Sequence, residues 1–336
     1  MRVALYLLTV LPTILLNLPR EKEVKAVEVV RVPDFCEGIV FDHDGYAYIS
    51  HGKFISRIRP DGKASVWAEG GAPNGHKVLA DGTHLVCDPS QHAVLRLDAT
   101  GKLLGKASAE CDGRPLREPN DLTLDAKGGF YFTDPGPYDP EKAAADGTVH
   151  YVDPQGKTHV VTQGLAYPNG IVIRLDGKTL LVGESLKNRI LSYEISSAGK
   201  VGPMMIFANL PLKQGEQIDN QPDGMCLDAE GNLYVAHFGM GQVQVLDRQG
   251  KLVRRYSAGN LSVSNVAFGG PGMDQLYLTG SIGIWDKTEG ALFRLDLKGV
   301  RGLTILPKKS GLIAATKPGI VGHPHSAEVS GKIHLE

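Results

Sequence analysis

One pattern recurs six times along the chain and restricts the folds that this sequence can adopt. Each copy begins with a polar residue whose side chain carries an oxygen, and continues as two short apolar runs joined by a turn. The six leading residues, at intervals of 37 to 54 residues, are Glu37, Asn74, Asn120, Asn169, Asp223 and Asn265. Periods of this size are typical of propellers and solenoids.

Each copy contains four short runs with the character of β-strands. The first two runs are rich in β-branched and aromatic residues and are joined by turns such as Asp44-Gly45, which is typical of β-hairpins. A third run, such as residues 55–58, and a fourth, such as residues 65–67, complete the copy. The sequence therefore predicts an all-β fold, a six-bladed β-propeller with four antiparallel strands per blade. We expect the strand-like residues 27–32 to complete the last blade and close the ring, so that no long sheet edge is left open.

Composition is that of an ordinary globular protein, with 42% hydrophobic and 22% charged residues. Lys and Arg number 36 against 37 Asp and Glu, giving a net charge of -1. This balance lacks the basic excess that favours nucleic acid as a partner. No Pro-rich or Ser-rich linker divides the chain, so we expect one propeller domain over residues 27–308 and a tail over 309–336, whose histidines are expected to be solvated.

The N-terminal residues form a separate segment. Residues 3–18 are almost wholly apolar after Arg2 and are interrupted by Pro12. Sixteen residues are fewer than the ~20 that span a bilayer as a helix. We therefore expect residues 1–26 to be a signal peptide or an N-terminal membrane anchor, with Val24-Lys25-Ala26 as the best cleavage triplet. The protein is then exported, periplasmic or extracellular and possibly membrane-tethered; a buried first strand in a cytoplasmic protein is the alternative.

The four cysteines do not identify the compartment. No CxxC motif or zinc-type spacing is present among Cys36, Cys87, Cys111 and Cys226. Buried free thiols and one disulfide both remain possible.

The six leading residues are expected to form a ring around the propeller axis, because the innermost strand of each blade lines the central channel. Any one of them can be explained as a turn residue, but all six offer a side-chain oxygen. Oxygen ligands without Cys or His suit a hard cation. We expect one divalent metal ion, calcium in the first place, with magnesium, manganese or zinc as alternatives.

Four motifs give the chain a resemblance to a known family. They are Phe35-Cys36-Glu37-Gly38, Pro119-Asn120-Asp121, Tyr167-Pro168-Asn169-Gly170-Ile171 and Pro222-Asp223-Gly224-Met225. With them, residues from about Val30 to Leu306 resemble the regucalcin (senescence marker protein)/gluconolactonase/luciferin-regenerating-enzyme family. The resemblance implies a six-bladed propeller with one divalent metal on its axis, and an enzyme that hydrolyses a sugar lactone.

The resemblance also implies roles for particular residues. Metal ligands fall on Glu37, Asn169 and Asp223, and Asn120 is a fourth ligand or a substrate contact. In the regucalcin branch an arginine lies two residues before the equivalent of Asn120. Glu118 occupies that position here, so we assign the substrate contact to the neighbouring Arg117.

Two further substrate contacts are expected from the predicted topology. Asn74 is the leading residue of the second copy, and His237 ends a second strand on the same face of the ring. Other second strands end at Asp88, Asp134 and Glu184, which are expected either to hold turns and ion pairs or to face the substrate. Tyr138, in a long loop on this face, can stack on a sugar or pack within its own loop.

Charge balance suggests how such a site works. Glu37 and Asp223 would offset the charge of the ion, and two neutral amides would leave it electrophilic towards a lactone carbonyl. Asp223 is the candidate general base for the attacking water, with hydroxide held at the metal as the competing nucleophile. The predicted function is a metal-dependent lactonase of the gluconolactonase type. The alternatives are a phosphotriesterase or other esterase at the same ion, and a non-catalytic propeller that binds metal, carbohydrate or protein.

Overall fold

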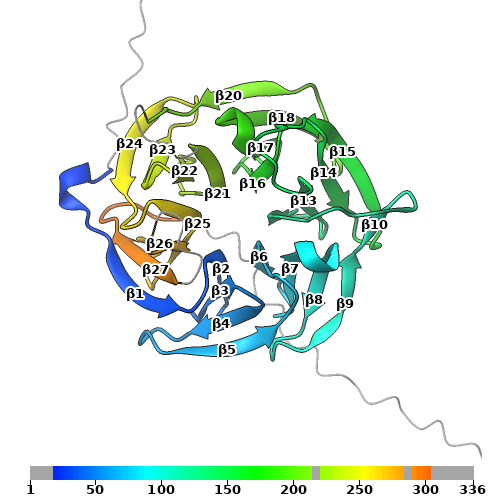
Figure 1. The fold of residues 1–336 in the computed structure, drawn as a ribbon. Coiled ribbons are helices and arrows are strands. Elements are labelled where there is room, and N and C mark those ends of the chain that lie inside the picture. Colours follow the sequence, from blue (N-terminus) through cyan, green and yellow to red (C-terminus); the bar gives the residue numbers. More distant parts are fainter. Residues whose placement is uncertain (1–17, 214–219, 284–288, 304–336) are drawn as a thin grey trace, which may run out of the picture.

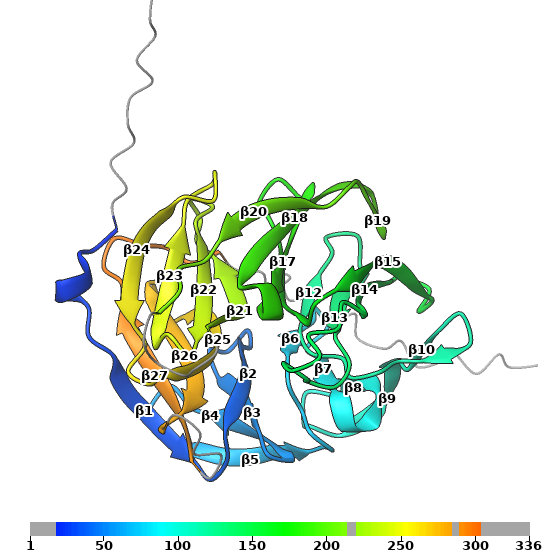
Figure 2. The same ribbon diagram turned by 45° about the horizontal axis from the view of Figure 1, so that its top comes forward.

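The computed structural model describes residues 18–213, 220–283 and 289–303 and shows six small antiparallel sheets arranged in a ring (Figure 1). The fold is the predicted six-bladed β-propeller. In each blade the strands follow one another outward from the axis in chain order, except that the outermost strand of the last blade comes from the beginning of the propeller (Figure 2).

The first three blades have the following strands. Blade 1 comprises β2 (Cys36–Phe41), β3 (Ala47–His51), β4 (Phe54–Ile58) and β5 (Ala64–Glu69). Blade 2 comprises β6 (His76–Val78), β7 (His84–Asp88), β8 (Ala93–Leu97) and β9 (Leu103–Ser108). Blade 3 comprises β12 (Leu122–Leu124), β13 (Phe130–Asp134), β14 (Gly147–Val152) and β15 (Thr158–Leu165).

The last three blades complete the ring. Blade 4 comprises β16 (Pro168–Ile173), β17 (Thr179–Glu184), β18 (Arg189–Ser197) and β20 (Met205–Asn209), and the short β19 (Lys200–Val201) also pairs with β18. Blade 5 comprises β21 (Gln221–Leu227), β22 (Leu233–Phe238), β23 (Gln242–Leu246) and β24 (Leu252–Ser257). Blade 6 comprises β25 (Ser262–Gly269), β26 (Gln275–Ser281), β27 (Gly290–Asp296) and β1 (Val27–Val32).

Ring closure occurs as the sequence predicts. Strand β1 pairs antiparallel with β27, from Val27 opposite Arg294 to Val32 opposite Gly290. One blade thus contains both the beginning and the end of the propeller, which removes the open sheet edge that two unjoined ends would leave.

Few elements lie outside the blades. A two-stranded hairpin, β10 (Glu110–Cys111) with β11 (Arg114–Pro115), follows blade 2. Three 3-10 turns complete the described elements: η1 (Glu21–Glu23), η2 (Pro89–Gln91) and η3 (Ser185–Lys187). The described part of the chain has no helix long and apolar enough to cross a membrane. All four cysteines are free thiols, which answers the question that their spacing left open.

The hydrophobic core lies between neighbouring blades. In blade 1, Val40 and Tyr48 pack in one cluster with Val86 and Leu95 of blade 2. Clusters of the same kind fill the other interfaces, for example Tyr131 of blade 3 with Leu180 of blade 4. Apolar burial therefore holds each blade to the next and keeps the inner strands at fixed positions around the axis.

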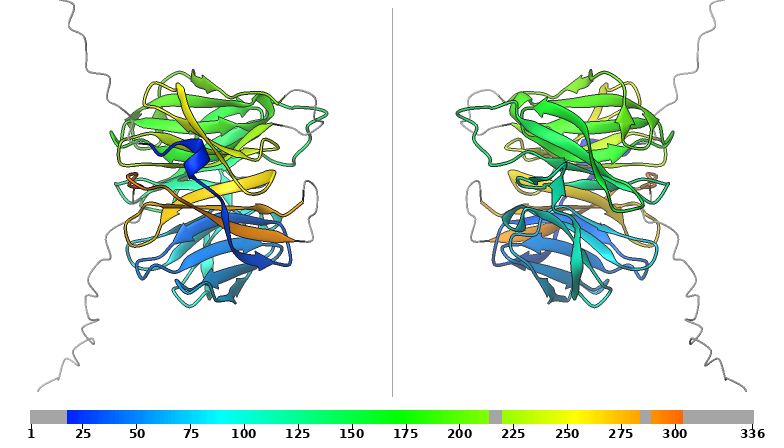
Figure 3. Two further views of the ribbon diagram at one scale, coloured as in Figure 1. Left: turned by 90° about the vertical axis from the view of Figure 1, so that its left-hand side faces the viewer. Right: turned by 90° about the vertical axis from the view of Figure 1, so that its right-hand side faces the viewer.

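Residues 18–26 pack on the outer side of blades 5 and 6 (Figure 3). Leu18 and Val24 are buried in a cluster that includes Tyr256 and Phe293. The carbonyl oxygen of Pro19 accepts a hydrogen bond from the Tyr256 hydroxyl at 2.9 Å. The predicted domain boundary at residue 27 thus leaves out a segment, residues 18–26, that packs on the propeller. Most of the apolar run at residues 3–18, and the predicted tail at 309–336, lie outside the described residues, so export and anchoring remain predictions.

Removing this packed segment is expected to destabilise the propeller. Compared with a chain that begins at Leu18, a chain that begins at Val27 loses two buried side chains and should unfold at lower denaturant concentration. The expected loss is about 3 kcal/mol or more. Lys22→Ala, an exposed position in the same segment, is the control and should change stability by less than about 0.5 kcal/mol. Equal unfolding midpoints for the two truncated chains would show that the segment contributes nothing to folding.

Candidate functional site

The six leading residues lie where the chain enters the inner strands, at one end of the central channel. Glu37, Asn169, Asp223 and Asn265 are within β2, β16, β21 and β25, and Asn74 and Asn120 lie two residues before the first residues of β6 and β12. Asn120, Asn169, Asp223 and Asn265 are buried.

Glycines beside the leading residues allow neighbouring blades to approach one another closely at the axis. A methyl group on Gly38 would lie 1.9 Å from the carbonyl oxygen of Asn74, and one on Gly170 would lie 2.2 Å from that of Asp223. Gly38 also has a φ of +51°, which disfavours other residues. Any side chain here would push the next blade outward, so glycine keeps the leading residues close together.

Hydrogen bonds between blades fix the same backbone. A hydroxyl or amide of one blade donates to a carbonyl oxygen at or beside the leading residue of the next. The pairs are Ser50 Oγ with Asn74 O (2.8 Å), Gly75 N with Asn120 O (2.9 Å), Thr133 Oγ1 with Asn169 O (2.9 Å), Ser185 Oγ with Pro222 O (2.7 Å) and Ser264 Oγ with Cys36 O (2.7 Å). The backbone is therefore rigidly placed, which is the condition for a precise ligand ring.

The two acidic members of the ring lie close enough to repel each other. Burial raises the pKa of Glu37 well above its usual value, and the nearby charges of Asp223 and Asp121 raise it further. Burial and the charge of Asp121 likewise raise the pKa of Asp223, while the Asn169 side chain and the Gly224 N–H act in the opposite direction. A cation held between these carboxylates would relieve their repulsion. The donor set, two carboxylates and neutral amides, consists of oxygens and fits a hard divalent ion.

The two ring members outside the expected ligand set, Asn265 and Asn74, have different surroundings. The Oδ1 atom of Asn265 already accepts a hydrogen bond from the Val266 N–H at 2.9 Å. Asn74 is half-buried, and its backbone is bonded on both sides. Nowhere in the described ranges do three or more His, Cys, Asp or Glu side chains gather as a metal-binding group. A metal at this site would therefore need the amides of Asn169 and Asn120 in addition to Glu37 and Asp223.

Arg117 is held by the loop that follows β13. Its guanidinium Nη2 lies 3.1 Å from Oδ2 of Asp146, and Nη1 donates to the Asp146 carbonyl oxygen at 3.1 Å. The guanidinium also packs against Gly136, where a methyl group would lie 2.3 Å from it. A substrate contact by Arg117 would have to share these interactions.

His237 is fully buried between blades 4 and 5. Its Nε2 atom lies 2.8 Å from Oδ1 of Asn188, and its Nδ1 atom lies 3.2 Å from Nε2 of Gln244. Burial lowers the pKa of His237 to about 3, with a smaller contribution from Arg255. The ring is therefore neutral, with both nitrogens engaged, and in this structure it aligns the two blades.

The three acids at the ends of second strands hold loops. Asp88 accepts from the backbone N–H groups of Gly71 and Ala72, at 2.8 and 3.0 Å. Asp134 does the same for Arg117 and Glu118, and Glu184 accepts from Ala166 N and Arg189 Nε. Of the two expected roles, holding turns and ion pairs or facing the substrate, the structure supports the first.

Tyr167 is a component of the site to which the sequence patterns assigned no role. Its backbone has a φ of +57°, an uncommon conformation for a tyrosine. Burial raises its pKa, and so do the charges of Asp223, Glu118 and Glu37, which places the phenol near the acidic ring. The ring of Tyr138 packs edge-to-face on Tyr167 with 5.0 Å between centroids. Its only sequence signal is its position directly before Pro168-Asn169, in a motif whose expected role falls on the asparagine.

Comparison with known proteins identifies the family. Residues 35–282 match the model of the SMP-30/gluconolactonase/LRE-like region. The chain therefore belongs to the SMP-30/gluconolactonase/LRE-like family. This confirms the resemblance that the four motifs indicate.

Relatives of this chain include named lactonases. Lactonase drp35 of Staphylococcus saprophyticus is 30% identical over 259 residues, which are 72% of this chain and 77% of the relative. The same enzyme of Staphylococcus haemolyticus is 30% identical over 64% of this chain, and the match spans 66% of that relative, about two thirds of its length.

Two solved structures have the same fold. A gluconolactonase of Xanthomonas campestris is 25% identical and superposes with a TM-score of 0.69, covering 83% of this chain and 91% of its own. A regucalcin of Agrobacterium tumefaciens, described as a calcium-binding protein, is 23% identical with a TM-score of 0.69, covering 82% and 94%.

Gly170→Ala tests the close approach of blades 4 and 5 at the axis. The new methyl group would overlap the Asp223 carbonyl oxygen, so we expect a loss of about 1–3 kcal/mol in the free energy of unfolding. Gly202→Ala is the matched control, because its methyl group would find its nearest atoms at an ordinary 3.7 Å. Denaturant unfolding of both variants measures the difference; a Gly170→Ala chain as stable as the control would mean that the axis is loosely packed.

Proposed function

We propose that this protein is a metal-dependent hydrolase that opens a sugar lactone at one divalent cation on the propeller axis. The observation that carries the proposal is the pair of acids at the axis, the half-buried Glu37 and the buried Asp223, whose pKa values are raised by desolvation and by neighbouring carboxylates. Two such groups at the centre of a rigid channel are costly unless a cation or a reaction uses them. Membership in the SMP-30/gluconolactonase/LRE-like family and similarity to a named lactonase support the same activity.

The residues that would hold the ion are Glu37, Asn169, Asp223 and Asn120, and calcium is the expected ion. When bound, a divalent ion polarises a carbonyl group and stabilises negative charge that develops on its oxygen. The two amides add no charge, which preserves that effect.

Asp223 would carry the proton in this reaction. Water attacks the lactone carbonyl carbon and gives a proton to the Asp223 carboxylate. The bond between that carbon and the ring oxygen then breaks, and Asp223 returns the proton to the departing oxygen. The product is the open hydroxy acid. The Asn169 side chain bonds Asp223 and would hold the carboxylate in place throughout.

Tyr167 and Tyr138 would form one wall of the substrate site. The Tyr167 phenol is neutral, because burial and the surrounding carboxylates raise its pKa. It therefore retains a proton with which to bond an oxygen of a polyhydroxylated substrate. Gln221 donates to the Tyr138 hydroxyl at 2.5 Å and would keep that ring against Tyr167.

Asp223→Asn tests the enzymatic role. The substitution preserves size and an oxygen ligand but removes the basic carboxylate, so turnover should fall at least the ~10²-fold typical of a lost acid-base group. Asn265→Ala, at the equivalent position of blade 6, should cost far less. Initial rates on a panel of aldonolactones, followed by acid release above the spontaneous rate and at saturating calcium, give the comparison.

Two results would contradict the proposal. Wild-type rates in the Asp223→Asn chain on every hydrolysed lactone would remove Asp223 as the base. No hydrolysis of lactones by the wild type, with or without added metal, would exclude the lactonase; hydrolysis of esters or phosphotriesters alone would assign the site to that chemistry instead.

A further inference from the structure

We propose that a buried ion pair, Lys77 with Asp121, sets the charge of the axial site and makes the site selective for divalent over trivalent ions. The inference rests on the proposed function, since it concerns the ion that Glu37 and Asp223 would hold. Neither residue belongs to the ligand set, and neither would touch the substrate. They are positioning residues that act through charge.

The pair lies just beneath the ring of leading residues. Lys77 is the third residue after Asn74, and Asp121 directly follows Asn120, so the two come from neighbouring blades. Lys77 Nζ lies 3.7 Å from Asp121 Oδ1, and the two side chains are 11% and 2% exposed. Gly75 makes room for the acid, because a methyl group there would lie 2.6 Å from the Asp121 Cα.

Both members of the pair are held in place. Asp121 Oδ1 accepts a hydrogen bond from the Leu122 N–H at 2.8 Å. Lys77 Nζ donates to the carbonyl oxygen of His76 at 3.2 Å. Fixed positions mean that their charges act on the axis at constant distance.

The charge of Asp121 reaches both acidic ligands. Its carboxylate adds to the burial that raises the pKa of Glu37 and of Asp223; burial raises the pKa of Asp121 as well, and the Lys77 ammonium group acts in the opposite direction. Three carboxylates and one ammonium group therefore share the axis. When all three carboxyl groups are ionised, the net charge of the four groups is that of two carboxylates, which one divalent ion neutralises.

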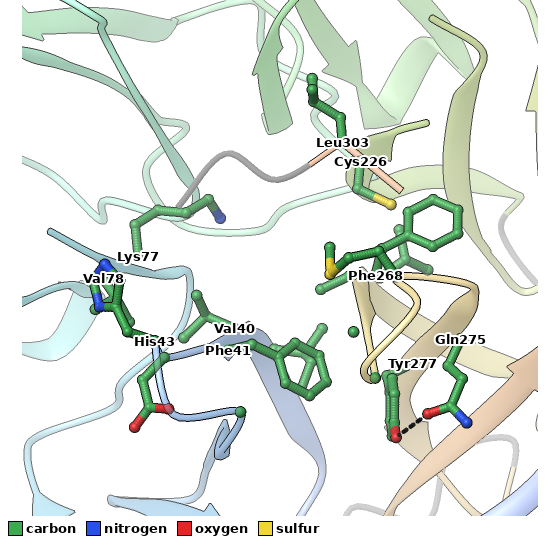
Figure 4. A pocket seen from close by; sticks show the side chains of 18 of the residues that line it. Val40, Phe41, His43, Lys77, Val78, Cys226, Phe268, Gln275, Tyr277 and Leu303 are labelled. Carbon is green, nitrogen blue, oxygen red and sulfur yellow. Dashed lines mark hydrogen bonds between the residues drawn. The ribbon is translucent and has the colours of Figure 1, made fainter. Parts of the chain in front are cut away.

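Lys77 also lines a mainly apolar cavity of about 680 Å³. Figure 4 shows Lys77 reaching into this space, with Val40, Phe41 and Phe268 among the walls. The lining also includes the charged side chains of Asp42, Asp44 and Arg294, but the ion pair of Lys77 is with Asp121. Asp121 is the carboxylate that pairs with Lys77, so removing either partner changes the axial charge by one unit.

Three variants separate this charge effect from a structural effect. Lys77→Met makes the axis more negative, Asp121→Asn makes it less negative, and the double variant restores the original balance. The measurement is the ratio of terbium(III) to calcium(II) affinity at pH 8, by terbium luminescence and calorimetric titration of the full chain. A trivalent ion responds more strongly to a unit of charge than a divalent one. The ratio should rise at least about tenfold in Lys77→Met, fall at least about tenfold in Asp121→Asn, and return to within about threefold of wild type in the double variant.

The outcomes are distinct. Binding by the wild type with an unchanged ratio in the variants, or a shift of the same sign in all three, would overturn the role of the pair and leave the proposed function intact. No binding of either ion by the wild type would overturn both. If Lys77→Met does not fold, Asp121→Asn and the double variant still test the proposal through the same ratio of terbium to calcium affinity. A ratio that falls in Asp121→Asn and returns when Lys77→Met is added cannot come from misplacement of Asn120.

Discussion

The close approach of neighbouring blades at the axis is the constraint on which the rest of the structure depends. Small residues and backbone groups meet where Gly38 faces Asn74 and where Gly170 faces Asp223. Apolar packing between blades sets the spacing of the ring, and hydroxyls such as Ser50 and Thr133 fix the carbonyl oxygens at its centre. With the backbone held in this way, side-chain oxygens from several blades converge on one small volume.

This convergence places like charges together. Burial raises the pKa of Glu37, Asp223 and Asp121, and the charge of Asp121 raises the pKa of the other two further. Keeping these carboxylates ionised at neutral pH opposes folding unless cations balance their charge. Lys77 supplies one positive charge, and in our proposal a divalent ion supplies the rest. Stability and function are then linked, because the ion that would activate a substrate is also the one that would make the ring favourable.

The sequence predicts the fold because the repeat is a property of the blade itself, and it indicates the family through the resemblance of four motifs. The period identified the inner strands, and equivalent positions identified the leading residues from Glu37 to Asn265. What the repeat does not contain is contact between blades. The pairing of Lys77 with Asp121 and the burial of His237 against Asn188 join positions that are not equivalent in the pattern. Leu18 packs on blades 5 and 6. The sequence could not predict this contact, because the same residue is the end of an apolar run that is also typical of a signal peptide.

The central claim is that the ring of leading residues binds one divalent ion, and calorimetric titration with calcium after chelation tests it most directly. We predict one calcium ion bound per chain by the wild type. Binding should be weakened at least about tenfold in Glu37→Gln, which keeps the side-chain size and removes one charge. No calcium bound by the wild-type chain, or equal affinity in Glu37→Gln, would contradict the account.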